Sequence, residues 1–242
     1  MIESVLFSAA RIGTFRGPMG LTNASGFFFE RGPRLFLVTS RHVLIDKASG
    51  HNPDRIEIEL HIDTSNLTRT SGFSVPLYRD GVNLWRQASD IGGDIDVAAI
   101  ELHRAALPRT SVIRAFTPAH LQMQEGAVVL GSPLIILGFP LGFHDTLHRL
   151  PVARHATLAS PFGIRFQGQG YFLTDARTHR GTSGAPVLMR STDRRDHAQL
   201  SWRLLGIHSS RIDMGDRDQD LDDPLALNCA WYADVLNTLT SD

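Results

Sequence analysis

Residues 181–186, with the sequence GTSGAP, constrain the fold and the chemistry of this chain more than any other segment. A serine hydroxyl is a weak nucleophile, so a catalytic serine needs a neighbouring base and amide groups that bind the developing oxyanion. Gly181 and Gly184 flank Ser183 and allow a sharp turn, so the amides of Gly181 and Ser183 are predicted to point into one small space. Taken alone, the segment also fits an ordinary surface turn.

Two other segments supply the side chains that such a serine needs. Residues 36–44 are an apolar run predicted to be a strand that ends in His42, and residues 94–100 place Asp96 at the head of a second apolar strand. A histidine is an effective general base near neutral pH, and a buried carboxylate fixes its tautomer and stabilises its protonated form. Asp94 competes with Asp96 for the role of the acid.

The order of these residues along the chain separates two classes of serine hydrolase. The α/β-hydrolases run Ser, Asp, His and hold the serine in a G-x-S-x-G turn. Here Ala185 stands where that turn needs its second glycine, and the order is His42, Asp96, Ser183. The sequence therefore excludes the α/β-hydrolase alternative and follows the order of chymotrypsin-like enzymes.

On these residues the chain resembles the bacterial trypsin-like serine peptidases of the chymotrypsin fold, close to the protease domains of HtrA-type and glutamyl-endopeptidase-type enzymes. The segments that carry the resemblance run almost from end to end: 25–29 with 37–43, 96–98, 136–142, 174–186 and 204–209. Because Asp96 directly precedes Val97 and Ala98, as in the acid motif of the family, we prefer it to Asp94. We expect a protease domain without the PDZ domain that HtrA enzymes append.

The resemblance implies an all-β fold of two antiparallel Greek-key β-barrels with a short C-terminal helix. Residues 1–115 are expected to form the barrel that carries the histidine and the aspartate, and residues 116–242 the barrel that carries the serine and the specificity pocket. Short β-rich runs separated by Gly, Pro, Asn and Asp agree with this. We expect strands at 5–14, 26–30, 35–39, 55–62, 73–77, 97–102, 127–139, 152–159, 170–174, 186–189, 201–207 and 226–229, and a helix at 230–239.

The resemblance also locates the pocket for the residue before the scissile bond, between the segment preceding Ser183 and the strand that follows it. Thr178 and His208 match the positions with which glutamyl endopeptidases and exfoliative toxins grip an acidic side chain, and Arg177 and Ser210 complete the expected pocket. A desolvated carboxylate needs donors or positive charge, so an acidic preference is favoured and a small apolar preference stays open. Arg177 stands six residues before Ser183, where trypsin has its aspartate, and this disfavours cleavage after Arg or Lys.

The aspartates between residues 213 and 223 follow the pocket strand and would repel an anionic substrate. Their spacing at 216, 218 and 220 resembles part of an EF-hand calcium loop, but Leu221 and Leu227 occupy the positions that need Gly and Glu. His144 and His148 have helical i,i+4 spacing without a matching carboxylate motif for zinc. We therefore expect no metal and no cofactor.

Charge and cysteine content narrow the expected partners and compartment. The net charge of −1 gives no pull toward nucleic acid or a membrane surface, so the expected partner is a protein or peptide substrate. Cys229 is the only cysteine, which suits a reducing compartment, and the short apolar run after Glu3 does not resemble a signal peptide. We expect a cytoplasmic protein, with a secreted or periplasmic location still open.

The predicted activity is that of a serine endopeptidase that forms an acyl-enzyme, with Ser183 as nucleophile, His42 as base, Asp96 orienting His42, and the Gly181 and Ser183 amides binding the oxyanion. Thr182 occupies the position of the acid that pairs with a freed N-terminus in digestive enzymes. Control is therefore expected through loop ordering, an activating partner protein or substrate access. The alternative is a catalytically silent, protease-like module that binds peptides or regulates another protein.

Overall fold

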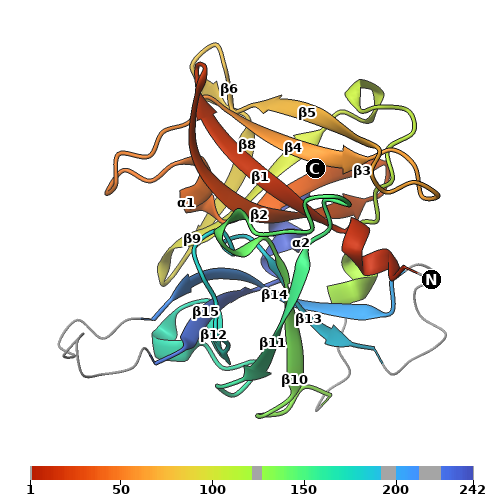
Figure 1. Cartoon of the computed structure of the whole chain (residues 1–242). Coiled ribbons are helices and arrows are strands. Elements are labelled where there is room, and N and C mark those ends of the chain that lie inside the picture. The colour runs from red at the N-terminus through yellow and green to blue at the C-terminus, as the bar shows by residue number, and fades with distance from the viewer. Residues whose placement is uncertain (1, 122–126, 192–199, 213–224, 242) are drawn as a thin grey trace, which may run out of the picture.

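Strands dominate the two bodies of the fold, which lie one above the other in Figure 1. The structure is a computed structural model and describes residues 2–121, 127–191, 200–212 and 225–241. The strands of the first body are β1 (Ala9–Arg16), β2 (Met19–Arg31), β3 (Arg34–Thr39), β4 (Arg55–His61), β5 (Thr70–Pro76), β8 (Trp85–Asp90) and β9 (Gly93–Leu102). The two-residue strands β6 (Tyr78–Arg79) and β7 (Val82–Asn83) form a separate hairpin.

The first body is a seven-stranded antiparallel sheet in the order β5-β4-β1-β2-β3-β9-β8. Strands β4-β1-β2-β3 have the spatial order of a Greek key. The prediction of a closed barrel is wrong for this body, because no ladder joins the edge strands β5 and β8. Side chains close its core instead: Val75 and Leu77 from one end of the sheet and Trp85 from the other are buried in the same apolar cluster.

The apolar runs of β2 and β3 are continuous because both of their faces are covered. Alternate residues of a strand point to opposite faces. Phe28 and Leu37 accordingly pack inside the first body, whereas Phe27, Phe36 and Val38 pack against the second body. An alternating polar pattern is therefore absent from these central strands.

The second body is a closed antiparallel barrel in the order β10-β11-β12-β15-β14-β13. Its strands are β10 (Pro133–Gly138), β11 (Val152–Leu158), β12 (Tyr171–Asp175), β13 (Pro186–Arg190), β14 (Trp202–Arg211) and β15 (Leu227–Tyr232). Strands β13-β10-β11-β12 again have Greek-key order. A side chain at Gly206 would place its Cβ 2.6 Å from the Trp231 carbonyl oxygen, so the close approach of β14 and β15 requires glycine there.

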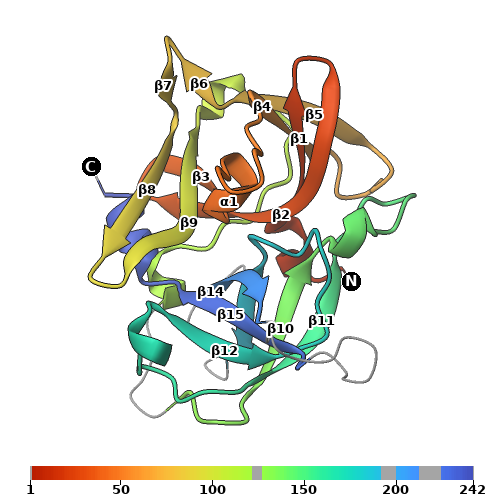
Figure 2. The same cartoon turned by 90° about the vertical axis from the view of Figure 1, so that its left-hand side faces the viewer.

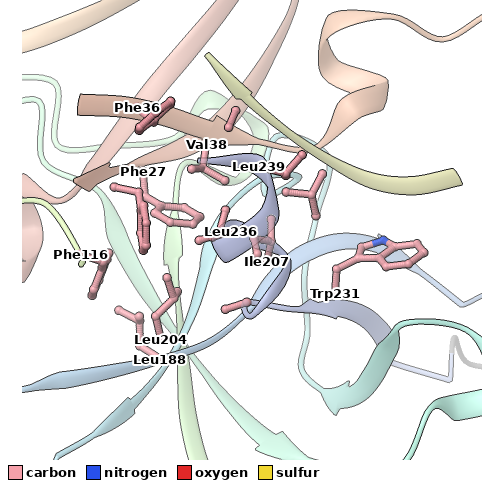
Figure 3. Close-up of a cluster of buried hydrophobic side chains, with 14 of the residues drawn as sticks. Phe27, Phe36, Val38, Phe116, Leu188, Leu204, Ile207, Trp231, Leu236 and Leu239 are labelled. Carbon is pink, nitrogen blue, oxygen red and sulfur yellow. The ribbon is translucent and has the colours of Figure 1, made fainter. Parts of the chain in front are cut away.

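A shared apolar core joins the two bodies. Figure 3 shows Leu236 and Leu239 of α2 (Val235–Leu239) among side chains from both, including Phe27 and Ile207. Burying a side chain of this size contributes about 1.5–3 kcal/mol. The packing of this core therefore sets how the two bodies face each other.

The remaining elements are one-turn helices: η1 (Ser4–Phe7), α1 (Arg41–Leu44), η2 (Arg104–Ala106), η3 (Pro118–Leu121), η4 (Pro140–Gly142) and η5 (Phe166–Gly168). The first strand, predicted at 5–14, starts only at Ala9 because η1 precedes it. The final helix, predicted at 230–239, is shorter because β15 continues to Tyr232. None of the helices formed by the described residues has the length and hydrophobicity needed to span a bilayer.

Candidate active site

His42 lies on α1, a single helical turn that follows β3 (Figure 2). The prediction that a strand ends in His42 is wrong, because β3 stops at Thr39 and Ser40 has extended backbone before the turn. Val43 and Leu44 are buried on the core side of the turn. This burial leaves the imidazole of His42 on the opposite side, where it lines the cleft between the bodies.

Asp96 on β9 holds His42 with two hydrogen bonds. The His42 amide donates to Asp96 Oδ1 at 2.9 Å, and His42 Nδ1 lies 2.7 Å from Asp96 Oδ2. A carboxylate only accepts, so Nδ1 carries the proton and Nε2 of the neutral ring is left as the acceptor. Asp94 lies elsewhere, with an oxygen 3.4 Å from Arg41 Nη2 on the surface.

Ser209 is a member of the site that the sequence did not single out. Its hydroxyl donates to Asp96 Oδ2 at 2.5 Å, so Asp96 accepts from both bodies of the fold. The one available signal was its position directly after His208, at the end of the apolar part of β14. A third donor to the carboxylate favours its charged form.

The pKa values of the two partners move in opposite directions. Burial alone lowers the pKa of His42, but the hydrogen bond and the charge of Asp96 outweigh it and leave this pKa above its usual value. Burial alone raises the pKa of Asp96, whereas the hydrogen bonds from His42 and Ser209 and the charge of His42 bring it below its usual value. Asp96 is therefore anionic, and it stabilises the protonated form of His42.

The loop that carries Ser183 is held against β2 by bonds that only small residues allow. Ser25 donates its amide to the Ser183 carbonyl at 3.0 Å and its hydroxyl to the Gly181 carbonyl at 2.8 Å. Gly184 has a φ of +85°, and a Cβ there would lie 2.2 Å from the Ser25 carbonyl oxygen. The sequence motif is thus explained by close packing of the two bodies as well as by the turn.

The Ser183 hydroxyl does not contact His42 through a hydrogen bond in this structure. It donates to the Ser209 carbonyl at 3.0 Å. Ser183 and His42 nevertheless line the same cleft, which has a volume of about 850 Å³. The structure thus joins His42 to Asp96 and brings Ser183 to their cleft without joining it to them.

Two main-chain amides beside Ser183 are free to bind an anion. The carbonyl of Arg180 accepts a hydrogen bond from the Leu141 amide at 2.5 Å. In a trans peptide the N–H points opposite to the C=O, so the Gly181 amide points away from Leu141. Among the described residues, neither the Gly181 amide nor the Ser183 amide has an acceptor. Paired free donors of this kind suit a developing oxyanion.

The four predicted pocket residues divide into two buried and two exposed residues. Thr178 is buried and donates its hydroxyl to Asn228 Oδ1 at 2.5 Å, a partner that no sequence motif marked. His208 is buried on β14, and its Nδ1 has no partner among the described residues. Arg177 and Ser210 are exposed. The aspartate-rich run at 213–223, with its EF-hand-like spacing, lies outside the described residues.

The environment of His208 favours its neutral form. Burial is the main cause, and the nearby charges of His42 and Arg211 add to it, lowering the pKa of His208 to about 3. A neutral imidazole has one N–H to donate and one nitrogen that accepts. His208 can therefore offer a single hydrogen bond to a substrate, without a positive charge.

Residues 24–194 match the trypsin-like peptidase domain family. The chain belongs to this family. Among curated protein sequences no match is found. The family assignment agrees with the mostly β architecture of one closed barrel, one open sheet and a short C-terminal helix.

Solved structures share this fold at low sequence identity. The inactive form of a mutant of Rv3671c from Mycobacterium tuberculosis is 14% identical, with 97% of this chain and 85% of that chain covered and a TM-score of 0.50. The serine endoprotease from Yersinia pestis is 13% identical, with coverages of 97% and 63% and a TM-score of 0.54. A scabies mite inactivated protease paralogue is 17% identical, with coverages of 98% and 92% and a TM-score of 0.56.

Proposed function

We propose that the chain is a serine endopeptidase in which Ser183, His42 and Asp96 act together. The observation that carries this proposal is the bond of Asp96 to His42 Nδ1 at 2.7 Å, which leaves Nε2 as an acceptor in the cleft that Ser183 also lines. Family membership supports a protein or peptide substrate. The division of the chain at residues 115 and 116 remains a prediction.

In the proposed reaction Ser183 Oγ forms a bond to the scissile carbonyl carbon while its proton moves to His42 Nε2. The Gly181 and Ser183 amides stabilise the negative oxygen of the tetrahedral intermediate. The C–N bond then breaks as His42 gives the proton to the leaving amine, and water repeats the sequence to release the acid. Asp96 stays ionised and stabilises the imidazolium throughout.

Cleavage of a diverse peptide library, with products identified by mass spectrometry, tests this proposal. The purified chain should produce internal cuts that Ser183→Ala protein does not produce. Cuts that persist unchanged in folded Ser183→Ala protein would assign the activity to another residue or to a contaminant. The thermal transition of both proteins serves as the folding control.

The orientation of Ser183 favours a second candidate, a silent peptide-binding or regulatory module. Its hydroxyl bonds to the Ser209 carbonyl instead of the base. Two of the similar structures are described as inactive or inactivated forms, so the fold alone does not imply turnover. Absence of labelling by a fluorophosphonate under every condition that keeps the chain folded would favour the module.

We also propose that His208 selects an acidic residue on the acyl side of the cut. It offers one N–H from a buried position, whereas the hydroxyl of Thr178 is already donated to Asn228. A site built to hydrogen-bond a substrate group penalises the analogue that lacks it, because its own polar group is left unpaired. We therefore expect more of the discrimination to come from His208 than from Thr178.

Matched peptides with Glu, Gln, Val or Arg before the scissile bond test this pocket. Glu should give the highest kcat/KM, and His208→Ala should reduce the ratio of Glu to Gln more than Thr178→Val does. A small residue such as Val being cleaved faster than Glu would favour the alternative of a small apolar preference. Because His208 is buried, its variant is compared only at temperatures where it stays folded.

A further inference from the structure

The leaving-group side of the proposed active site has a strand edge that is not paired with another strand. The cleft that His42 and Ser183 line continues along residues 19–24, six consecutive residues of β2. In this stretch β2 pairs with β1 on one side, with a register shift between Asn23 and Gly20, but its pairing with β3 begins only at Phe27. The other edge of residues 19–24 therefore faces the cleft without a strand partner.

Near the nucleophile, the main-chain groups of this edge point toward the cleft at Asn23. Ser25 donates its N–H to the carbonyl of the nucleophile, so its main-chain groups point away from β1. Thr22 donates its N–H to the hydroxyl of Thr14, on the β1 side. Successive residues of a strand alternate in this direction. Asn23, between Thr22 and Ser25 and two residues from Ser25, therefore presents its N–H and C=O groups to the cleft, whereas a register shift beyond Thr22 ends this regular alternation.

A substrate segment bound along this edge runs antiparallel to β2. The strand approaches the nucleophile at Ser25 and is farthest from it at Met19, whereas the leaving-group segment starts at the nucleophile and runs outward. At about 3.3 Å per residue, Asn23 lies opposite roughly the second residue after the cut. Edge strands of this kind bind extended peptides by adding a strand to the sheet.

The groove has an arginine side chain at each end, and neither arginine forms an ion pair with any residue in the part of the chain that the structure describes. Arg180 precedes Gly181 at the end near the nucleophile, and Arg16 lies opposite Met19 beside the β1–β2 turn, at the far end. Both line the cleft and both are exposed, and among the described residues neither has a carboxylate partner. Asp46 is the only carboxylate among the described lining residues. Two guanidinium groups therefore face one carboxylate.

We propose that this groove, residues 19–24 with Arg16 and Arg180, binds the leaving-group segment as an extended strand and selects acidic side chains on it. Arg180 recognises an acid within two residues of the cut, and Arg16 an acid four to six residues beyond it. Guanidinium groups bind carboxylates through paired N–H donors, and exposed pairs of this kind change affinity by up to roughly fivefold each. The inference rests on the proposed endopeptidase function and adds to it a substrate class.

Quenched fluorescent peptides test the two positions separately. The peptides share one acyl side and carry Glu, Gln or Lys at either the second or the fifth residue after the cut. For the wild type we expect kcat/KM to fall from Glu to Gln to Lys at both positions, with a ratio of Glu to Gln of roughly fivefold that shrinks in 0.5 M NaCl. Arg180→Gln should abolish the ratio at the second position only, and Arg16→Gln at the fifth position only.

Arg109→Gln is the matched control, because Arg109 is an exposed arginine that does not line the cleft. It should keep both ratios at their wild-type values. Equal kcat/KM for the Glu and Gln peptides in the wild type would overturn the proposal. Glu-to-Gln ratios that persist in the Arg16→Gln, Arg180→Gln double variant would also overturn it.

A binding measurement separates failure of the groove from failure of the proposed function. Fluorescence anisotropy of the same peptides with Ser183→Ala protein needs no turnover. Tighter binding of the Glu peptides, weakened by Arg16→Gln or Arg180→Gln, supports the groove even if the wild type cleaves nothing. Equal binding of the Glu and Gln peptides overturns the groove even if the wild type is an active peptidase.

Discussion

The seven-stranded sheet and the closed barrel each supply one side of the proposed site, and the two sides differ in the hydrogen bonds that their residues make. The sheet supplies His42 and Asp96, joined by hydrogen bonds of 2.9 and 2.7 Å within one body. The barrel supplies Ser183, whose hydroxyl bonds to the carbonyl of Ser209 in the same barrel. The base is thus already oriented for proton transfer, whereas the nucleophile is held by its own body.

Contacts between the bodies therefore decide whether the two sides work together. Ser25 on β2 bonds to the loop that carries Ser183, and Ser209 on β14 bonds to Asp96. The first bond is donated by the sheet to the barrel, and the second by the barrel to the sheet. A change of χ1 at Ser183 redirects its hydroxyl without moving the main chain. Variants on each side can test how far the sides depend on each other.

Removing either reacting group should have the largest effect. Ser183→Ala and His42→Ala should each lower kcat by roughly 10⁴–10⁶, and the double variant should lose little more, because the groups act as a unit. Peptide hydrolysis by folded protein measures this. Additive losses in the double variant would show that the barrel and sheet residues act independently.

Asp96→Asn should lower kcat by roughly 10⁴, because the amide no longer holds the productive tautomer of His42. Asp94→Asn should change kcat less than about twofold, since Asp94 makes only an exposed ion pair with Arg41. The kcat values of the two variants under identical conditions give the comparison. A larger loss for Asp94→Asn would transfer the role of the acid to Asp94.

Gly184→Ala should test how closely the barrel loop must approach the sheet. The new Cβ would lie 2.2 Å from the Ser25 carbonyl oxygen at a φ of +85°, so unfolding should become easier by about 2–5 kcal/mol. Gly32→Ala is the matched control, with a φ of +58° and no atom within 4 Å, and should cost about 1–2 kcal/mol. Chemical denaturation measures both, and equal losses would argue against a close packing role for Gly184.

Ser209→Ala should lower kcat less than Ser183→Ala, His42→Ala or Asp96→Asn. It removes one donor to Asp96 and leaves the bonds to His42, so kcat should fall roughly tenfold. The acid limb of the pH–rate profile should move little, because His42 keeps its charged partner. A loss as large as that of Asp96→Asn would mean that the barrel, and not the sheet alone, orients the base.

The sequence indicated which of the candidate residues lie near one another better than it indicated the contacts around them. His42, Asp96 and Ser183 each stand in a local motif, and the structure bonds Asp96 to His42 and places His42 and Ser183 on one cleft. Asn228 stands in no motif, and its bond to Thr178 depends on the pairing of β15 with β12 and β14. Such a contact depends on tertiary structure, so no local pattern marks it.

The sequence predicted the fold class. The errors lie in single elements, where tertiary packing decides the structure and the local sequence pattern does not. Residues 45–93 show no clear period beyond the strands expected at 55–62 and 73–77, yet Trp85–Asp90 form β8, because β9 provides a partner for them. The open edge between β5 and β8 also has no signal in the sequence. Whether a curled sheet closes depends on the register of distant strands.

The pH dependence of Ser183 labelling by a fluorophosphonate tests the central claim most directly. Labelling requires a neutral His42, whose pKa is raised by Asp96, so the rate should fall in acid along one titration with a midpoint above 6.5. Asp96→Asn should lower this midpoint as well as the rate, and His42→Ala should abolish labelling. Peptide mapping that finds Ser183 unlabelled in folded protein, or labelled at a rate that stays constant from pH 5 to pH 8, would contradict the account.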